Sequence, residues 1–150
     1  MKIDGGCHCG YITYEGEADP EKTKVCHFID CQQLTGTAFR TFVPVADHAL
    51  RLSGKPTIYV RTGESGHKLQ LAFCPRCGSP IYGTAVDDGP KVYFIRVGTV
   101  RQREQLIPRS QIWTRSQQHW VDHLASIVTR RRWRKQDSRP SSPAPTEVIE

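Results

Sequence analysis

The sequence predicts a mainly β fold, with one domain over residues 1–129 that ends in a helix, and a basic, Pro/Ser-rich tail over residues 130–150. Three observations support this prediction. The chain has 150 residues, and a chain of this size forms one core and buries roughly two-thirds of its unfolded surface. Apolar residues alternate with polar ones in several short segments, and helical spacing occurs in a single stretch late in the chain.

Short strands are expected where apolar residues recur with a period of two. The alternating residues are Ile12 and Tyr14, Ile58 and Val60, and Leu69, Leu71 and Phe73. Each set is bounded by Gly, Pro, Asp or Ser, which favour turns. The segment Lys91–Val97 follows the turn signal Asp87–Pro90 and is rich in β-branched and aromatic residues, so we expect a buried strand near the centre of the sheet.

One stretch has the spacing of an amphipathic helix. Trp120, Leu124, Ile127 and Val128 follow one another at positions i, i+4, i+7 and i+8, which places them on one face of a helix from about residue 116 to residue 133. The following segment, residues 138–145, consists mainly of Ser and Pro. That composition predicts a disordered tail, because it buries too little apolar surface to offset its conformational entropy.

The net charge of +6 is divided evenly between the domain and the tail. Residues 130–150 carry six basic and three acidic side chains, and the remaining 15 basic and 12 acidic side chains lie in residues 1–129. Each part therefore has a net charge of +3, and the domain is only mildly basic. The basic cluster at residues 130–135 is compatible with binding a nucleic acid, and equally with a solvated helix end; nucleic acid is not an expected partner of the domain.

The chain is expected to be cytoplasmic. No apolar run approaches the roughly 20 residues that a membrane span needs, and the first residues lack the apolar stretch of a secretion signal. In a reducing compartment the six cysteines are expected to be free thiols or metal ligands rather than disulfides.

The cysteines occur in three pairs with different spacings. The pairs are Cys7-x-Cys9, Cys26-x4-Cys31 and Cys74-x-x-Cys77 followed by Gly78. A Cys-x-x-Cys-Gly turn directs two sulfurs at one metal, and a structural zinc takes four ligands. The sequence therefore predicts one structural zinc on Cys7, Cys9, Cys74 and Cys77 that joins distant parts of the domain. A redox-active dithiol at Cys74 and Cys77 and buried unliganded thiols are the alternatives.

These motifs resemble those of the glutathione-dependent formaldehyde-activating enzymes and centromere protein V. The similarity spans roughly residues 4–120 and includes four segments, Gly5–Gly10, Cys26–Gly36, Phe73–Tyr82 and Ile112–Ser116. The resemblance implies a β-tent of coiled antiparallel sheets and a structural zinc on the four cysteines named above. It also implies a second, catalytic zinc on a Cys-x-Cys-x-x-Cys segment, where glutathione and formaldehyde combine.

The sequence departs from that pattern at Phe28, which stands where the family has its middle cysteine. Cys26 and Cys31 remain, but a catalytic zinc typically takes three protein ligands and a phenyl ring supplies no lone pair. His27 and Asp30 adjoin these cysteines, and their side chains diverge from them on an extended backbone; His8, His48 and His67 reach the site only through the fold. We therefore expect this second site to be impaired, with Cys26 and Cys31 as reduced thiols or a reversible pair.

Two hypotheses for function follow. The first is a carbon–sulfur lyase that acts on a glutathione-type adduct of a small aldehyde, with Cys26, Cys31 and His27 as catalytic residues and Thr35 and Gly36 as ligand contacts. Turn formation explains Thr35 and Gly36 equally well. The second is a zinc-stabilised binding module without catalysis. Trp113 and Trp120 are expected to pack in the core.

Overall fold

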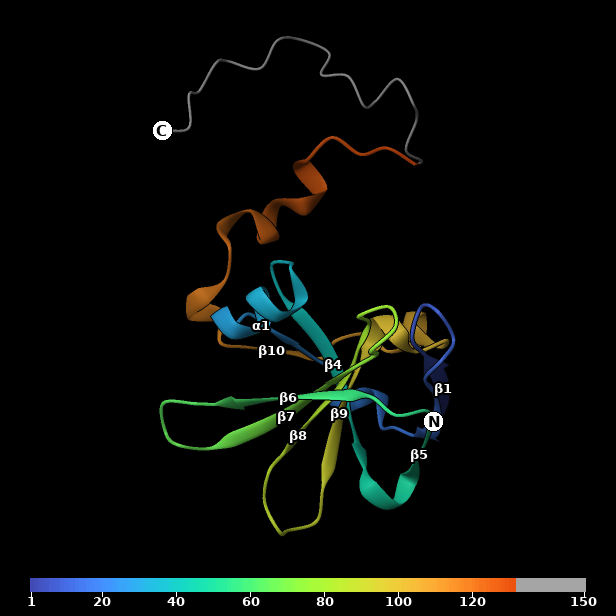
Figure 1. Ribbon diagram of the computed structural model, residues 1–150. Coiled ribbons are helices and arrows are strands. Elements are labelled where there is room, and N and C mark those ends of the chain that lie inside the picture. The colour runs from blue at the N-terminus through green and yellow to red at the C-terminus, as the bar shows by residue number, and fades with distance from the viewer. Residues whose placement is uncertain (132–150) are drawn as a thin grey trace. The chain divides into compact units, whose positions relative to one another are not determined.

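The computed structural model describes residues 1–131 of the chain, which divide into two compact units. The first unit is Met1–Gln118, and the second begins at His119. Strands β1 to β10 and helix α1 belong to the first unit (Figure 1). A mainly β fold is therefore confirmed. The boundary expected at residue 129 remains a prediction, and the Ser/Pro-rich segment lies outside the described residues.

A three-stranded antiparallel sheet contains the first strands of the chain. Its order is β1 (Lys2–Gly6), β2 (Thr13–Glu17) and β5 (Leu50–Ser53). Gly5 pairs with Tyr14 in this sheet and also forms a bridge to Val100. A Cβ atom on Gly5 would lie 2.1 Å from the carbonyl oxygen of Thr99, so only glycine allows β1 to approach this segment so closely.

The second sheet has seven strands, in the order β10-β3-β4-β9-β8-β7-β6. Their bounds in that order are Ser110–Ile112, Lys24–Cys26, Arg40–Ala46, Val92–Arg96, Pro80–Ala85, Lys68–Phe73 and Thr57–Thr62. Only β10 and β3 pair in parallel. The strand expected at the centre is β9, and it is the fourth of the seven.

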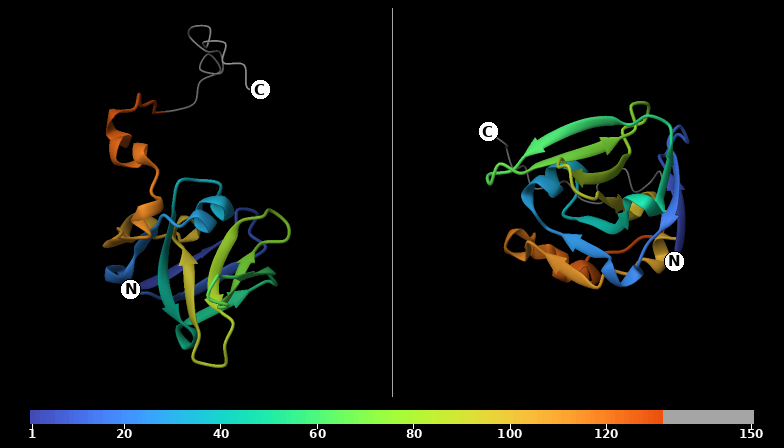
Figure 2. Two further views of the ribbon diagram at one scale, coloured as in Figure 1. Left: turned by 90° about the vertical axis from the view of Figure 1, so that its left-hand side faces the viewer. Right: turned by 90° about the horizontal axis from the view of Figure 1, so that it is seen from below.

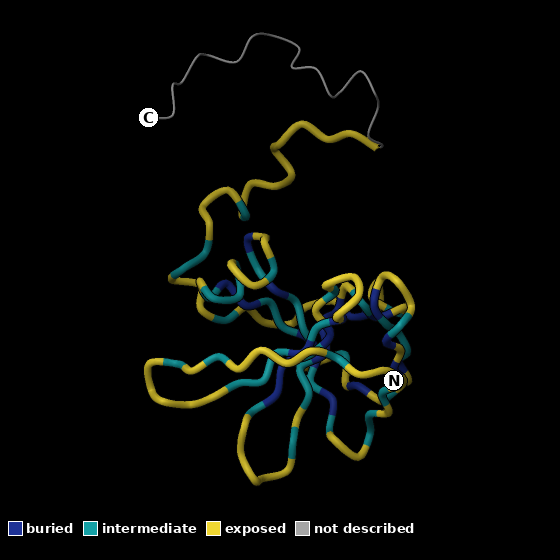
Figure 3. Tube along the Cα trace, in the orientation of Figure 1, coloured by how far each residue is buried: buried dark blue, intermediate teal, exposed yellow. Residues whose placement is uncertain are grey.

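Both sheets contribute to one core. Figure 2 shows them curving around a shared interior, and the buried segments gather there in Figure 3. The core is formed by apolar side chains of both sheets and their loops, chiefly Ile3, Ile12, Tyr14, Val43, Val45, Ile81, Ile95, Val97, Val100 and Leu106. Two cysteines of the predicted zinc site, Cys7 and Cys74, belong to the same cluster. The predicted metal site therefore adjoins the core.

Helix α1, Ile29–Thr35, connects β3 to β4, and the sequence pattern does not predict it. Its apolar side chains, Ile29 and Leu34, are exposed, so the helix has no buried stripe that periodicity could detect. It ends at Gly36, which has a φ of 68°, the left-handed conformation that glycine adopts without steric cost. Four short 3-10 segments lie between other strands, Pro20–Lys22, Asp47–Ala49, Val97–Thr99 and Arg103–Gln105, and a fifth, Thr114–Ser116, follows β10.

The second unit contains the helical segment expected late in the chain, but in a shorter and tighter form. It is the 3-10 segment η6, His119–Ser126, and it is broken by non-helical angles at His123. Because a 3-10 helix repeats every three residues, the α-helical spacing produces no continuous apolar face. Within the described residues the apolar side chains of this stretch are exposed: Trp120, Leu124, Ile127 and Val128.

The expectation that Trp113 and Trp120 pack in the core is wrong. Their side chains are 43% and 48% exposed. Trp113 has a left-handed backbone, with a φ of 57°, and its ring stacks on that of Phe28.

No helix within residues 1–131 combines the length and the apolar character that crossing a membrane requires.

Candidate functional site

Four cysteines from two distant loops converge on one point. Cys7 and Cys9 follow β1, and Cys74 and Cys77 follow β7. Their sulfur atoms all lie within 4.8 Å of one another. The Cys9 sulfur is 3.6 Å from that of Cys7 and 3.7 Å from that of Cys74. The cluster predicted from spacing is therefore present, and it can bind a metal ion.

The two loops turn sharply enough to direct their sulfurs inward. In the second loop, the N–H of Gly78 donates to the carbonyl of Cys74 at 2.9 Å, and Gly78 has a φ of 77°. In the first, the N–H of Gly10 donates to the carbonyl of Cys7 at 3.1 Å, and Gly10 has a φ of 81°. Both turns require a left-handed residue directly after a cysteine, which glycine supplies.

Local hydrogen bonds favour thiolates in this cluster. The N–H of Ile12 donates to the Cys7 sulfur at 3.2 Å, and the N–H of Arg76 donates to the Cys74 sulfur at 3.4 Å. Hydrogen bonds from the Ser79 hydroxyl and backbone lower the pKa of Cys77 to about 5. Such donors stabilise negative sulfur, the form that binds a metal.

The same cluster cannot hold four thiolates without a cation. The backbone of Tyr11 lowers the pKa of Cys9, but desolvation and the neighbouring thiols together outweigh it and the pKa rises to about 11. Mutual repulsion of the sulfurs is relieved when a metal ion lies among them. A tetrad of thiols is the donor set of a structural zinc, so the residues present fit that ion.

Cys26 and Cys31 form a separate pair. Cys26 ends β3 and is buried, and Cys31 lies in α1. The Cys31 and Cys26 sulfurs are 3.5 Å apart, and Arg40 Nη1 lies 3.8 Å from the Cys31 sulfur. The hydrogen bond from Cys26, together with the positive charge of Arg40, lowers the pKa of Cys31 to about 6, and the same proximity raises the pKa of Cys26. Near neutral pH the pair therefore holds one proton, on Cys26.

Within the described residues, no third metal ligand joins this pair. Among these residues, the four-cysteine cluster is the one group of three or more Cys, His, Asp or Glu donors that lie close enough together to hold a metal ion. His27 is fully buried, and its Nε2 lies 2.7 Å from Oε1 of Gln111. Asp30 pairs with Arg61 at 2.5 Å. The three other candidate histidines, His8, His48 and His67, are exposed on separate loops. A second zinc with three protein ligands does not fit these residues.

Phe28 is integrated into an aromatic stack. Its ring centroid lies 4.5 Å from that of Trp113, with 30° between the planes. The guanidinium of Arg61 lies over the Phe28 ring, 5.4 Å from the ring centroid. Phe28 thus packs against Trp113 and Arg61.

Thr35 and Gly36 end helix α1. The Thr35 hydroxyl donates to the carbonyl of Cys31 at 2.6 Å, and Gly36 is exposed. Helix termination explains both residues, and their contact with a ligand stays a prediction.

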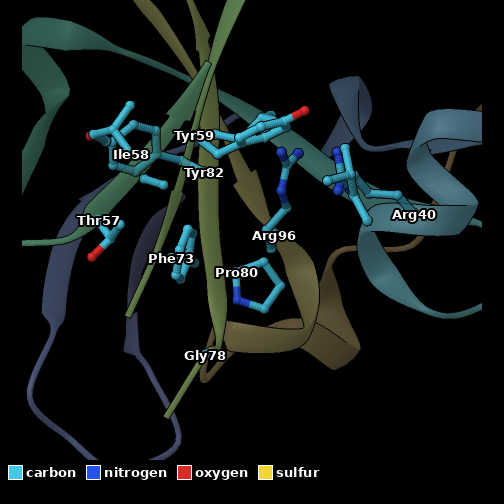
Figure 4. Close-up of a pocket in the computed structure, with 12 residues that line it drawn as sticks. Arg40, Thr57, Ile58, Tyr59, Phe73, Gly78, Pro80, Tyr82 and Arg96 are labelled. Atoms are coloured by element: carbon cyan, nitrogen blue, oxygen red, sulfur yellow. The ribbon is translucent and has the colours of Figure 1, made fainter. Parts of the chain in front are cut away.

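A cavity of about 560 Å³ is lined in part by Arg40, the residue whose Nη1 lies 3.8 Å from the Cys31 sulfur. Arg40 reaches it from β4 and Arg96 from β9, as Figure 4 shows. Its walls are largely apolar and include Ile58, Tyr59, Phe73, Pro80 and Tyr82. Neither arginine belongs to one of the sequence motifs. The available signal was Arg96 itself, a charged residue between Ile95 and Val97 in an otherwise apolar strand.

The sequence was compared with models of known protein families. A model of the family described as glutathione-dependent formaldehyde-activating enzyme matches residues 2–116, which is more than half of the chain. The chain belongs to this family. The match to the glutathione-dependent formaldehyde-activating family includes both the four-cysteine cluster and the Cys26–Cys31 pair, and it confirms the resemblance derived from the motifs.

One solved structure supports the fold of this family member. A crystal structure of a Rhodobacter sphaeroides protein from a structural genomics programme has a TM-score of 0.56 and 20% sequence identity. The similarity covers 74% of this chain and 99% of that one. At this identity the likeness concerns the fold alone. No curated protein matches the chain.

Proposed function

We propose that this family member forms or breaks the carbon–sulfur bond of a glutathione-type thiol adduct of a small aldehyde at the Cys26–Cys31 pair, without a second zinc. The observation that carries the proposal is the Cys31 sulfur, 3.5 Å from Cys26 and 3.8 Å from a guanidinium nitrogen of Arg40. The four-cysteine cluster is the proposed zinc site. Zinc there is structural and holds the two loops together.

Proton transfer by Cys31 is consistent with this reaction class. In the forward direction, the Cys31 thiolate takes the proton of the incoming thiol, and the resulting sulfur bonds to the carbonyl carbon of the aldehyde. The carbonyl oxygen then takes the proton back from Cys31, which restores the thiolate and gives the hydroxymethyl thioether. The reverse sequence breaks the bond. Arg40 stabilises negative sulfur throughout.

The remaining candidate residues have supporting roles in this proposal. Cys26 donates the hydrogen bond that keeps Cys31 ionised. His27 is buried and bound to Gln111, so we assign it the positioning of the segment between the two cysteines. Thr35 and Gly36 fix the end of the helix that carries Cys31.

Metal content tests the missing second zinc. Elemental analysis of the purified chain is expected to give about one zinc per chain, since a structural site takes four ligands. Phe28→Cys restores the third thiolate and is expected to raise the value towards two. Ile29→Cys is the matched control, because it adds a thiol at the next, exposed position and is expected to leave the value at one. Two zinc ions in the unchanged chain would contradict the proposal.

Turnover tests the chemistry. The rate at which glutathione and formaldehyde combine is expected to rise in the presence of the chain, and Cys31→Ser is expected to abolish that increase while zinc content stays the same. If the unchanged chain binds glutathione but alters neither direction of the reaction, a second candidate replaces the first. That candidate is a binding module without catalysis, and the lack of a third ligand beside Cys26 and Cys31 favours it.

A further inference from the structure

Two arginines are buried at one end of the cavity without an acidic partner. Arg40 is 7% exposed and Arg96 is 8% exposed. Neither forms an ion pair with a carboxylate of residues 1–131, and the Nε atom of each has no hydrogen-bond partner. Buried charges in proteins are normally paired, and no carboxylate among the described residues pairs with either guanidinium.

The neighbouring groups do not neutralise this charge. Cys26 and Cys31 act on both guanidiniums, Arg61 acts on Arg40, and Arg40 acts on Arg96. Arg61 is already paired with Asp30, and the cysteine pair supplies one negative charge when Cys31 is a thiolate. One positive charge remains. Burial, reinforced by the charge of Arg40, lowers the pKa of Arg96 to about 9, and Arg96 is therefore still charged at neutral pH.

The fold holds Arg96 against the cavity rather than letting it reach solvent. A Cβ atom on Gly83 would lie 2.8 Å from Nη2 of Arg96, so the guanidinium rests directly on the backbone of β8. Figure 4 shows the side chains of Arg40 and Arg96 directed toward the same end of the cavity. A flat, fixed guanidinium presents its N–H groups as a fork that matches the two oxygens of a carboxylate.

We propose that this cavity binds a small organic carboxylate, with its carboxylate between Arg40 and Arg96 and its apolar body against Tyr59, Phe73 and Tyr82. The volume of about 560 Å³ falls within the roughly 300–1,000 Å³ of small-molecule sites. The apolar wall selects a ligand with an apolar body over an inorganic anion. This site goes beyond the proposed function, because its ligand contacts are the two guanidiniums and the apolar wall rather than the Cys31 sulfur or a metal ion.

Titration calorimetry of the zinc-loaded full chain with benzoate tests the proposal, with benzamide as the neutral analogue of nearly the same shape. Benzoate is expected to bind at least tenfold more tightly than benzamide and than sulfate. Arg96→Met and Arg40→Met are each expected to weaken benzoate at least tenfold. Arg51→Met, which removes an exposed arginine, is expected to leave it unchanged.

Equal affinities for benzoate and benzamide would overturn the proposal, as would benzoate binding that survives both Arg96→Met and Arg40→Met. Sulfate binding as tight as benzoate binding would remove the role of the apolar wall. The comparison of benzoate with benzamide uses the unchanged chain, so it decides the matter even where an arginine variant does not fold. Cys31→Ser removes the thiolate 3.8 Å from Arg40, so it is expected to keep or tighten benzoate binding while losing turnover, which separates failure of this proposal from failure of the proposed function.

Discussion

Replacing Cys26 by alanine is expected to raise the pKa of Cys31 without touching Cys31 itself. The hydrogen bond from Cys26 is the largest influence on Cys31 and lowers its pKa; burial opposes it, and the charges of Arg40, Arg96 and Arg61 add to it. Cys26→Ala removes the donor and leaves the arginines in place. Cys26→Ser is the matched control, because its hydroxyl still donates a hydrogen bond.

The size of the effect follows from the two pKa values. With a pKa of about 6 instead of the ordinary 9.0, half of Cys31 is thiolate at pH 6 rather than about 0.1%, a gain of about 500-fold. A thiolate of lower pKa is also less nucleophilic, and three pKa units cost about 20-fold. Cys31 is therefore expected to react about 20-fold faster at pH 6 than an ordinary thiol, and Cys26→Ala is expected to remove much of that advantage.

Alkylation with iodoacetamide, followed by peptide mapping by mass spectrometry, measures this rate at Cys31 alone. In the unchanged chain the rate is expected to reach half its maximum near pH 6, in Cys26→Ser close to the same value, and in Cys26→Ala at a clearly higher pH. Zinc content is measured on each sample to verify that the four-cysteine cluster is intact. A midpoint near pH 9 in the unchanged chain, or one that Cys26→Ala does not move, refutes the reasoning.

Three further predictions concern stability. Removing metal with a chelator is expected to lower the melting temperature, because an ion that binds only the folded state adds its binding energy to stability. It is also expected to make the four cluster cysteines, Cys7, Cys9, Cys74 and Cys77, reactive towards iodoacetamide. An unchanged melting curve with four protected thiols counts against a metal there. Gly78→Ala is expected to destabilise the chain by about 1 kcal/mol in chemical denaturation, because Gly78 has a φ of 77° and a left-handed backbone costs a residue with a Cβ atom this much. Gly98→Ala is the control and is expected to be nearly neutral, because a Cβ there also meets nothing but φ is not positive. Equal losses of stability in the two variants would refute the assignment. Cys31 has a folded pKa of about 6, below the 9.0 of the unfolded chain, so its contribution to stability is fully present above pH 9 and is lost as the pH falls through 6. The difference in unfolding free energy between the unchanged chain and Cys31→Ser is therefore expected to grow as the pH rises from 6 to 9. A difference that does not change with pH contradicts this expectation.

The four-cysteine cluster could be predicted from the sequence because each half of it is local. Two residues separate Cys74 from Cys77 and one separates Cys7 from Cys9, so each loop alone determines that its sulfurs converge. The donor number of zinc then requires the two halves to meet. The central position of β9 could be predicted for a similar reason, since its β-branched and aromatic residues lie together in one short segment and favour a strand.

The arginine pair could not be predicted in this way because nothing local links its members. Arg40 begins β4 and Arg96 ends β9, and they meet because these strands pair antiparallel with Phe42 opposite Arg96. Helix α1 has exposed apolar residues, so periodicity does not predict it. The apolar spacing around His119–Ser126 predicts an α-helix, because spacing alone does not separate an α-helix from a 3-10 segment broken at His123. Register and strand order are tertiary properties, and they create the part of the site that the motifs do not contain.

The change at Phe28 affects packing as well as metal binding. A cysteine at this position would add a third sulfur to Cys26 and Cys31, but it would remove the ring that stacks on Trp113 at 4.5 Å, a contact worth about 0.5–1.5 kcal/mol beyond the area it buries. The same ring carries the guanidinium of Arg61, whose other partner is Asp30 on the helix of Cys31. At the position where the motif resemblance implies a metal ligand, Phe28 therefore supplies packing next to the helix that carries Cys31. The Cys31 sulfur lies 3.5 Å from that of Cys26 and 3.8 Å from Nη1 of Arg40, and the positive charge of Arg40 helps to lower the pKa of Cys31.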